Sequence, residues 1–323
     1  MRLSVLDQSP VGEGSSHADA LLASVDLAQA AEEWGFARYW TAEHHASPGF
    51  AGSAPEILAA VLLARTSRMP VGTGGVLLPR YPPVKVAEVF AVLASLYPGR
   101  VDMGLGRAGG PAADYPQRVS LLRRLLGMDG SAKDGTAEDE AHRLVGAPVA
   151  PPRMWLLGAG SGSARMAGEL GTDFAYAHFL APDRAEEALT TYRALLRGRN
   201  TTDEAPGVLA VRVVTAESEA EAEALAHSVL LWRSRKDLGE DLPLPSARVA
   251  RNHRWTALEA ERASVRRRSL VWGTPDQVLT RLAELAKEYA VEEVMVNTLT
   301  CDPEDRFHSY RLLAEWQAVT VGG

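Results

Sequence analysis

The chain has 323 residues, of which 46% are hydrophobic and 23% charged, and its formal net charge is −7 at pH 7. This acidic balance argues against a nucleic-acid partner, and no apolar run is long enough to cross a bilayer. The single cysteine, Cys301, excludes an internal disulfide framework and a multi-cysteine metal site. Because the N-terminus also lacks a signal-peptide pattern, these features predict a soluble cytoplasmic protein with no membrane contact.

Strand and helix patterns alternate along the first half of the chain. Strands are predicted at Leu3–Leu6, Phe36–Trp40, Met69–Leu78 and Val101–Gly106, and the helices that follow them at His17–Trp34, Ala54–Ala64, Pro82–Leu96 and Tyr115–Leu126. Proline in the first turn favours the third helix, since its missing N–H costs nothing there. The polar, glycine-rich segment Gly127–Arg143 is predicted to be irregular surface chain.

The second half of the chain continues the alternation. Strands are predicted at Met154–Leu157, Asp173–Phe179, Val208–Val214 and Glu293–Asn297, with helices ending at Leu170 and covering Arg184–Leu196, Ser218–Trp232, Pro275–Tyr289 and Asp305–Trp316. Thr274 is a suitable N-cap before Pro275. A charged insertion, Arg233–Arg268, follows the seventh strand.

Eight strands, each followed by a helix, predict one (β/α)8 TIM barrel that spans residues 1–323. An open, doubly wound sheet is the alternative. In a barrel, the carboxyl ends of all the strands meet at one mouth. The residues expected around that mouth are Asp7, Glu43, His44, His45, Gly74, Gly75, Arg107, the loop Gly160–Ser163 and His178.

Glu43, His44 and His45 come directly after the second strand. Three adjacent proton-carrying side chains at a strand end indicate catalysis, because histidine changes charge near neutral pH. The alternative is that they only cap the strand through local hydrogen bonds. Extended chain alternates its side chains, so Glu43 and His45 should point away from His44. His44 is therefore the main catalytic candidate, and Glu43 and His45 are weaker ones.

A Gly/Ser loop, Gly158–Ala164, joins the fifth strand to a helix N-terminus. Free backbone N–H groups, hydroxyls and the helix dipole suit a phosphate there, although a plain tight turn is the alternative. Arg107, at the end of the fourth strand, offers a cation to the same anion. Gly74-Gly75 has no side chains to block a ring, so together these features predict a phosphorylated planar cofactor; a β-bulge is the alternative for the glycine pair.

Six segments in this order and spacing resemble the bacterial-luciferase-like flavin monooxygenase family. They are Trp40–His45, Val71–Pro79, Lys85–Glu88, Leu96–Arg107, Leu156–Gly171 and Gly273–Pro275, and their order and spacing extend over nearly the whole chain. Within that family the chain is most similar to the single-polypeptide bacterial oxidoreductases.

The resemblance implies a TIM barrel that binds reduced FMN supplied by a separate flavin reductase. Molecular oxygen then forms a peroxyflavin, which oxidises a small organic substrate. His44 matches the family's catalytic histidine, and Gly74 and Gly75 match the pair under the flavin ring, often joined by a cis peptide. Arg107, Gly160, Ser161 and Ser163 match the phosphate contacts, and Ala159 and Gly162 belong to the same predicted cofactor-binding loop.

Two segments depart from the family pattern: Ala108–Pro116 is shorter than the loop of most relatives, and Arg233–Arg268 corresponds to their mobile lid. A deazaflavin-dependent oxidoreductase and a non-catalytic flavin-binding protein remain alternative functions. A homodimer is expected through the helices after strands two and three. Their apolar faces carry Ile57, Leu58, Ala60, Val61, Leu62, Ala64, Val86, Val89, Phe90 and Leu93.

Overall fold

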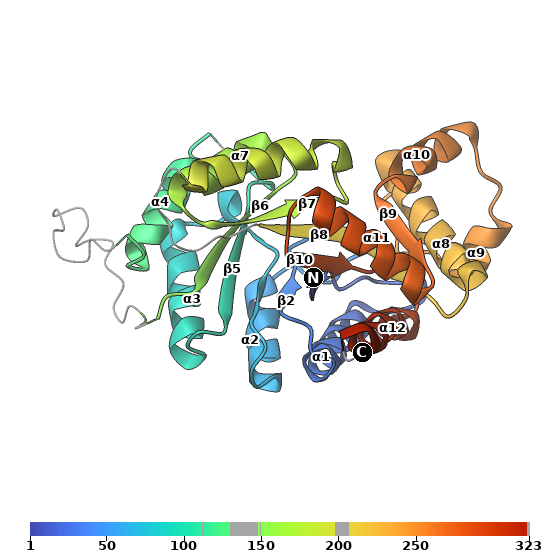
Figure 1. Cartoon of the computed structure of the whole chain (residues 1–323), viewed down its shortest axis with the longest axis horizontal. Helices are drawn as coiled ribbons and strands as arrows, with labels where there is room; N and C mark the ends of the chain where they lie inside the picture. The colour runs from blue at the N-terminus through green and yellow to red at the C-terminus, as the bar shows by residue number, and fades with distance from the viewer. Residues whose placement is uncertain (112, 130–147, 149, 198–206, 322–323) are drawn as a thin grey trace.

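Eight parallel strands close into a barrel at the centre of the molecule (Figure 1). The computed structural model describes residues 1–111, 113–129, 148, 150–197 and 207–321. The barrel strands are β1 (Arg2–Asp7), β2 (Tyr39–Thr41), β3 (Val71–Thr73), β5 (Val101–Gly106), β6 (Arg153–Gly158), β7 (Asp173–Ala177), β8 (Val208–Thr215) and β10 (Glu293–Asn297). Neighbours pair in chain order, and pairing of β10 with both β8 and β1 closes the ring. The predicted (β/α)8 barrel is confirmed, and the open sheet is excluded.

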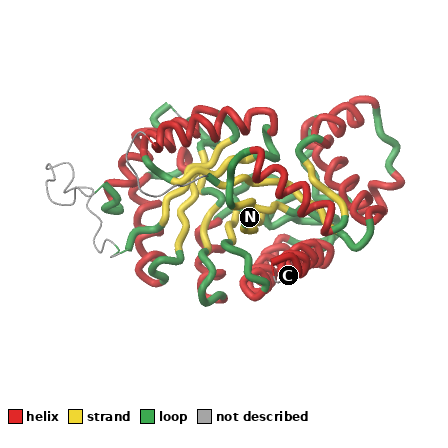
Figure 2. The backbone as a smooth tube through the Cα atoms, in the orientation of Figure 1, coloured by secondary structure: helices red, strands yellow, loops and turns green. Residues whose placement is uncertain are grey.

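Helices cover the outside of this barrel (Figure 2). The α-helices of the described residues are α1 (His17–Glu33), α2 (Pro55–Arg65), α3 (Pro83–Leu96), α4 (Tyr115–Leu125), α6 (Ser161–Leu170), α7 (Ala185–Arg197), α8 (Glu219–Asp237), α9 (Ala247–Asn252), α10 (Ala257–Arg267), α11 (Pro275–Glu288) and α12 (Pro303–Val321). Of these, α9 and α10 pack on α8. Most of the predicted segment Gly127–Arg143 lies outside the described residues. Among the helices of the described ranges, none combines the length and apolar character needed to span a bilayer.

Alternation along the strands separates two apolar layers. Val5, Tyr176 and Val211 belong to a large cluster between the strands and the helices. Leu6 and Ala175 belong to a smaller cluster inside the barrel, with Trp40, Trp155, Ala210 and Met295. Because successive side chains of a strand point to opposite faces, the position of each residue in its strand decides whether it faces the interior.

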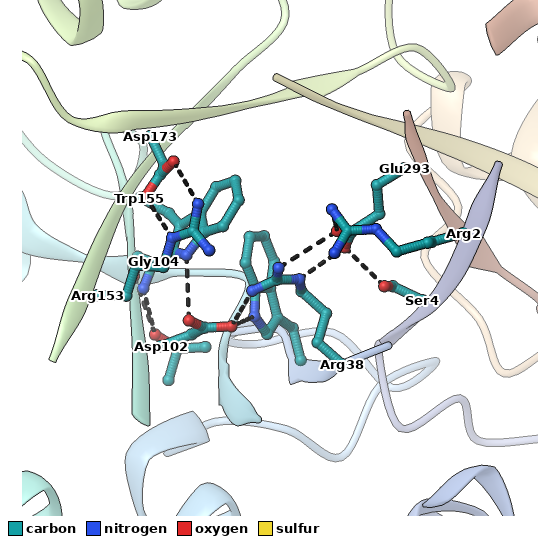
Figure 3. Close-up of polar contacts among 11 residues, drawn as sticks. Arg2, Ser4, Arg38, Asp102, Gly104, Arg153, Trp155, Asp173 and Glu293 are labelled. Carbon is teal, nitrogen blue, oxygen red and sulfur yellow. Dashed lines mark hydrogen bonds and ion pairs between the residues drawn. The ribbon is translucent and has the colours of Figure 1, made fainter. Parts of the chain in front are cut away.

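Buried charges close the barrel at the amino ends of its strands (Figure 3). The Arg38 guanidinium contacts Asp102 at 2.7 Å and Glu293 at 2.6 Å, and all three side chains are almost fully buried. Trp40 donates a further hydrogen bond to Asp102, and Ser4 donates one to Glu293. Removal of one partner of such a network is strongly destabilising, because it leaves a buried charge uncompensated. The opposite end of the barrel is therefore the open one.

The prediction of one continuous strand at Met69–Leu78 is wrong. It divides into β3 and the short β4 (Val76–Leu77), separated by a cis peptide bond between Gly74 and Gly75, and a 3-10 helix, η1 (Leu78–Arg80), follows. A Cβ atom on Gly75 would lie 2.6 Å from the backbone oxygen of Gly104. The backbones approach too closely here for any other residue.

The charged insertion has more regular structure than predicted. Helix α8 continues to Asp237, α9 and α10 follow, and strand β9 (Leu270–Gly273) pairs with the second half of β8. Side chains capable of capping, Ser246 and Thr256, begin the two short helices. A second apolar cluster that includes Trp232 and Ala263 packs this group against the barrel, at the end of the molecule where Figure 1 shows α8, α9 and α10.

Candidate active site

A cavity of about 620 Å³ opens at the carboxyl ends of the strands. The predicted site residues that line it are Glu43, His44, Gly74, Gly75, Arg107, Ala159 and Ser163. Its remaining walls include Gln8, Phe50, Phe179, Arg212, Trp232, Arg233, Lys236 and Met295. Its volume is within the usual range for a site that takes a small molecule or cofactor.

His44 is held by its neighbours at one nitrogen and lacks a partner at the other. Its Nε2 lies 3.0 Å from Nε2 of Gln8, and its ring packs on Phe50 at a centroid distance of 4.2 Å. Its Nδ1 is buried and has no hydrogen-bond partner among the described residues. Burial, followed by the positive charges of Lys236 and Arg212, lowers the pKa of His44 to about 4. The imidazole is therefore neutral at physiological pH.

The hydrogen bonds around Gln8 determine which nitrogen of His44 carries the proton. A guanidinium can only donate, so the Gln8 atom that Nη2 of Arg212 contacts at 3.0 Å is the amide oxygen. The amide N–H₂ of Gln8 therefore faces His44 and donates to its Nε2. A neutral imidazole that accepts at Nε2 carries its hydrogen at Nδ1. His44 thus holds a buried Nδ1–H donor on a ring that lines the cavity.

Glu43 and His45 hold the loop around His44. The buried Glu43 carboxylate accepts hydrogen bonds from the backbone N–H of Leu77 and from the Tyr81 hydroxyl, each at 2.7 Å. Nε2 of His45 forms a hydrogen bond with the same carboxylate, and His45 does not line the cavity. Glu43 thus fixes η1 and the end of β4 against the strand-two loop. His45 is outside the cavity, as alternation predicted, but Glu43 lines the cavity together with His44.

The Gly/Ser loop and Arg107 lie together at another side of the cavity. Helix α6 begins at Ser161, and its N-cap, Gly160, provides no side-chain hydrogen bond to the first backbone N–H groups. The space beside Gly160 is open, and a Cβ on Gly162 would lie 3.9 Å from Nη1 of Arg107. Uncapped helix amides next to a guanidinium fit an anion such as a phosphate.

Only some of the loop's side chains face the cavity. Ser163 lines it, whereas the Ser161 hydroxyl donates to Glu187 of α7 at 2.7 Å. Ser161 can therefore contribute its backbone N–H but not its hydroxyl. The Gly74-Gly75 pair provides a wall without side chains on the same cavity.

Asp7 and His178 were predicted at the mouth, and both predictions are wrong. Asp7 pairs with Arg306 of α12 at 2.8 Å and accepts from Tyr39. His178 packs against Tyr289 and does not line the cavity. The reason in both cases is alternation: Leu6 and Gln8 face the interior around Asp7, as Ala177 and Phe179 do around His178.

Sequence reasoning missed Gln8 and Arg212, which the fold brings to His44. Arg212 is the one charged residue in the strand Val208–Thr215, whose other residues are apolar except Thr215. A charge in a fully buried strand is a signal for function. Gln8 gave no signal in the sequence beyond its place after the first strand.

A model of the luciferase-like monooxygenase family matches residues 1–292. The uncharacterized protein YceB of Bacillus subtilis is 38% identical over 331 residues, covering 98% of this chain and 99% of that protein. The N-acetyl-S-alkylcysteine monooxygenase of the same organism is 33% identical, covering 98% of each chain.

Among solved structures, apo-MsnO8 is similar with a TM-score of 0.84 and 38% identity, covering 97% of this chain and 96% of that one. Two more distant structures share the fold. They are 3,6-diketocamphane monooxygenase in complex with FMN, at 18% identity and a TM-score of 0.71, and an F420-dependent secondary alcohol dehydrogenase, at 15% and 0.71. They cover 98% and 96% of this chain, and 98% and 97% of their own lengths.

Proposed function

This chain belongs to the luciferase-like monooxygenase family, and we propose that it uses reduced FMN from a separate reductase, with molecular oxygen, to oxidise a small organic substrate. The observation that carries the proposal is the cavity at the carboxyl ends of the strands, where His44, Arg107, Ser163 and the Gly74-Gly75 wall meet. A cation, an uncapped helix N-terminus and a wall without side chains in one cavity suit a phosphorylated planar cofactor beside a neutral imidazole.

The residues present fit FMN. Arg107, the backbone N–H groups of the Gly160–Ser163 turn and Ser163 itself would hold the phosphate, while Gly74-Gly75 would lie against the flavin ring. Reduced FMN, when bound, supplies the electrons that activate dioxygen. Phe50, Phe179 and Met295 give the cavity an apolar wall for the substrate, and His44 lines the same cavity with a neutral imidazole.

A deazaflavin is the alternative cofactor, since the fold also serves an F420-dependent enzyme. The purified protein should be titrated anaerobically with reduced FMN, oxidised FMN and the deazaflavin, each followed by calorimetry. Tight binding of reduced FMN alone supports the proposal, and tight binding of the deazaflavin alone contradicts it. If reduced FMN binds but, once oxygen is admitted, is reoxidised just as in protein-free buffer, the result would instead favour a non-catalytic flavin-binding protein.

We also propose a homodimer through α2 and α3. Their inner faces pack on the barrel through residues such as Leu62 and Phe90, but the outer faces expose four large apolar side chains. The exposed fractions are 63% for Ile57, 42% for Val61, 58% for Val92 and 66% for Leu96. Adjacent exposed apolar side chains of this size indicate an interface.

Light scattering at micromolar concentration tests the dimer. The unmodified chain should have the mass of two chains, and Val61→Glu should reduce it to one. Leu22→Glu is the matched control, because Leu22 is 64% exposed on α1 and should leave the mass unchanged. A monomer in the unmodified chain refutes this part of the proposal.

A further inference from the structure

Arg212 is a buried cation without a carboxylate partner. Its side chain extends from β8 into the cavity, and the residue is only 7% exposed. Its Nε donates to Oδ1 of Asn297 at 3.1 Å and its Nη2 donates to Oε1 of Gln8 at 3.0 Å, so both acceptors are neutral amides. No acidic side chain in the described ranges forms an ion pair with it. Buried charges are normally paired, because their desolvation is costly.

The other cations of the cavity have acidic partners or a different task. Arg233 pairs with Asp237 at 2.8 Å, and Lys236 pairs with Asp241 at 2.9 Å. Arg107 lies at the Gly/Ser loop. Among the described lining residues, Glu43 is the one carboxylate, and its oxygens already accept from the backbone N–H of Leu77 and the Tyr81 hydroxyl. With these charges paired, Arg212 is a cavity cation that the described residues leave without an acidic partner.

Arg212 is on a different wall from the proposed phosphate site. Arg107 and the Gly/Ser loop follow β5 and β6, and Gly74-Gly75 follows β3, whereas β8 lies between β7 and β10. The guanidinium carbon lies 4.8 Å from the centre of the Phe179 ring, and Met295 and Trp232 line the cavity as well. Arg233 and Lys236 also line the cavity, but each is paired with an aspartate, so this wall offers one cation without an acidic partner beside apolar surface. That combination suits a small molecule with a single charged end.

Burial and the positive charges of Arg233 and Arg266 lower the pKa of the Arg212 guanidinium to about 9. Its neighbours therefore disfavour its charged form, and an arriving anion would remove that penalty. Two of its five N–H groups have protein acceptors, which leaves donors for a planar group that accepts two hydrogen bonds.

We propose that Arg212 binds the carboxylate of the substrate, so that the substrate class is a small organic acid with an apolar body. The inference rests on the proposed function only in treating this ligand as the molecule that is oxidised. Gln8 bridges Arg212 and His44, and all three residues line the cavity, so a carboxylate at Arg212 would hold the rest of the molecule beside the His44 ring.

Calorimetric titration with hexanoate and hexanamide, which differ only in their head groups, tests the carboxylate site. The full chain should bind hexanoate at least about ten-fold more tightly than hexanamide, with or without oxidised FMN. Arg212→Met should abolish this preference, and Arg212→Lys, which keeps the charge, should retain part of it. Gln8→Glu should also abolish it, because that substitution gives Arg212 a carboxylate from the protein itself. Equal binding of the two probes by the unmodified chain, or a preference that survives Arg212→Met, overturns the proposal.

Two controls separate this result from the fate of the cofactor proposal. Arg107→Ala should weaken FMN binding and leave the hexanoate preference intact, whereas Arg212→Met should leave oxidised and reduced FMN binding unchanged. A loss of reduced-FMN binding in Arg212→Met, without any hexanoate preference in the unmodified chain, would assign the guanidinium to the flavin and refute the carboxylate site. A hexanoate preference in a chain that binds no FMN would refute the cofactor proposal alone. Circular dichroism of each variant verifies that it is folded.

Discussion

The hydrogen bonds of Gln8 make Gln8→Glu a sharp test of the proton position on His44. In the native chain Gln8 accepts from Arg212 and donates to Nε2 of His44, each across 3.0 Å. A carboxylate of the same shape still accepts from Arg212 but has no hydrogen to donate. His44 must then become the donor at Nε2, so we expect its hydrogen to move from Nδ1 to Nε2 and its pKa to rise.

The size of the rise follows from the contacts. A hydrogen bond to a charged group contributes about 1.5–3 kcal/mol. Each pKa unit corresponds to about 1.4 kcal/mol, which allows a rise of about one to two units. Arg212 neutralises part of the charge of the new carboxylate, so we expect the pKa rise to be at the lower end of this range. The pKa of His44, which burial holds at about 4, should therefore rise by about one unit in the variant.

Nitrogen-15 NMR of histidine-labelled protein, titrated from acid to neutral pH, measures both quantities. His178 is an internal control, because burial lowers its pKa to about 4 as well but its ring packs against Tyr289, away from Gln8. Its signals should not change. An unaltered tautomer and pKa of His44 in Gln8→Glu would refute the hydrogen-bond assignment and with it the free Nδ1–H donor.

Four further outcomes are expected. Arg107→Ala should weaken FMN binding about ten-fold or more and leave riboflavin binding unchanged, whereas equal losses for both ligands in calorimetry would assign Arg107 to the fold. His44→Ala should keep the fold and reduced-FMN binding but lose a proton donor that contributes about 10²–10⁴-fold, so oxygen consumption should yield hydrogen peroxide; stopped-flow spectra and product yield like those of the unmodified chain would disprove this role. Asp102→Ala should lower the free energy of unfolding in urea by about 3 kcal/mol or more, because the Arg38 guanidinium loses a buried partner, and a loss below about 1 kcal/mol would contradict that network's importance. Finally, the folded state lowers the pKa values of His44 and His178 to about 4, so their contribution to the free energy of unfolding should be complete above about pH 6.5 and fall as the pH drops toward 4. The loss should reach up to about 3 kcal/mol for each residue. In His178→Phe the part of this pH dependence that is due to His178 should disappear, which urea midpoints at pH 7 and 4.5 would measure.

Hydrophobic periodicity in the sequence was enough to predict the barrel. Each strand and helix is coded locally, by apolar alternation, by caps such as Thr274 and by prolines in first turns, and eight repeats of one pattern leave few ways to close a parallel sheet. The glycine positions and His44 also carried their signal locally, since a glycine pair or a histidine after a strand is unusual in itself. Even the interruption at Gly74 occurs within the strand predicted there.

Only the tertiary structure decided which side chains face the cavity. Asp7 and His178 end strands as His44 does, yet alternation turns both outward, and a shift of one residue would have reversed the outcome. Gln8 and Arg212 are 204 residues apart and meet because β1 and β8 both pair with β10. Their contact sets the tautomer of His44 and leaves a guanidinium without an acidic partner, and no local pattern encodes either property, because both depend on strands brought together by closure of the barrel.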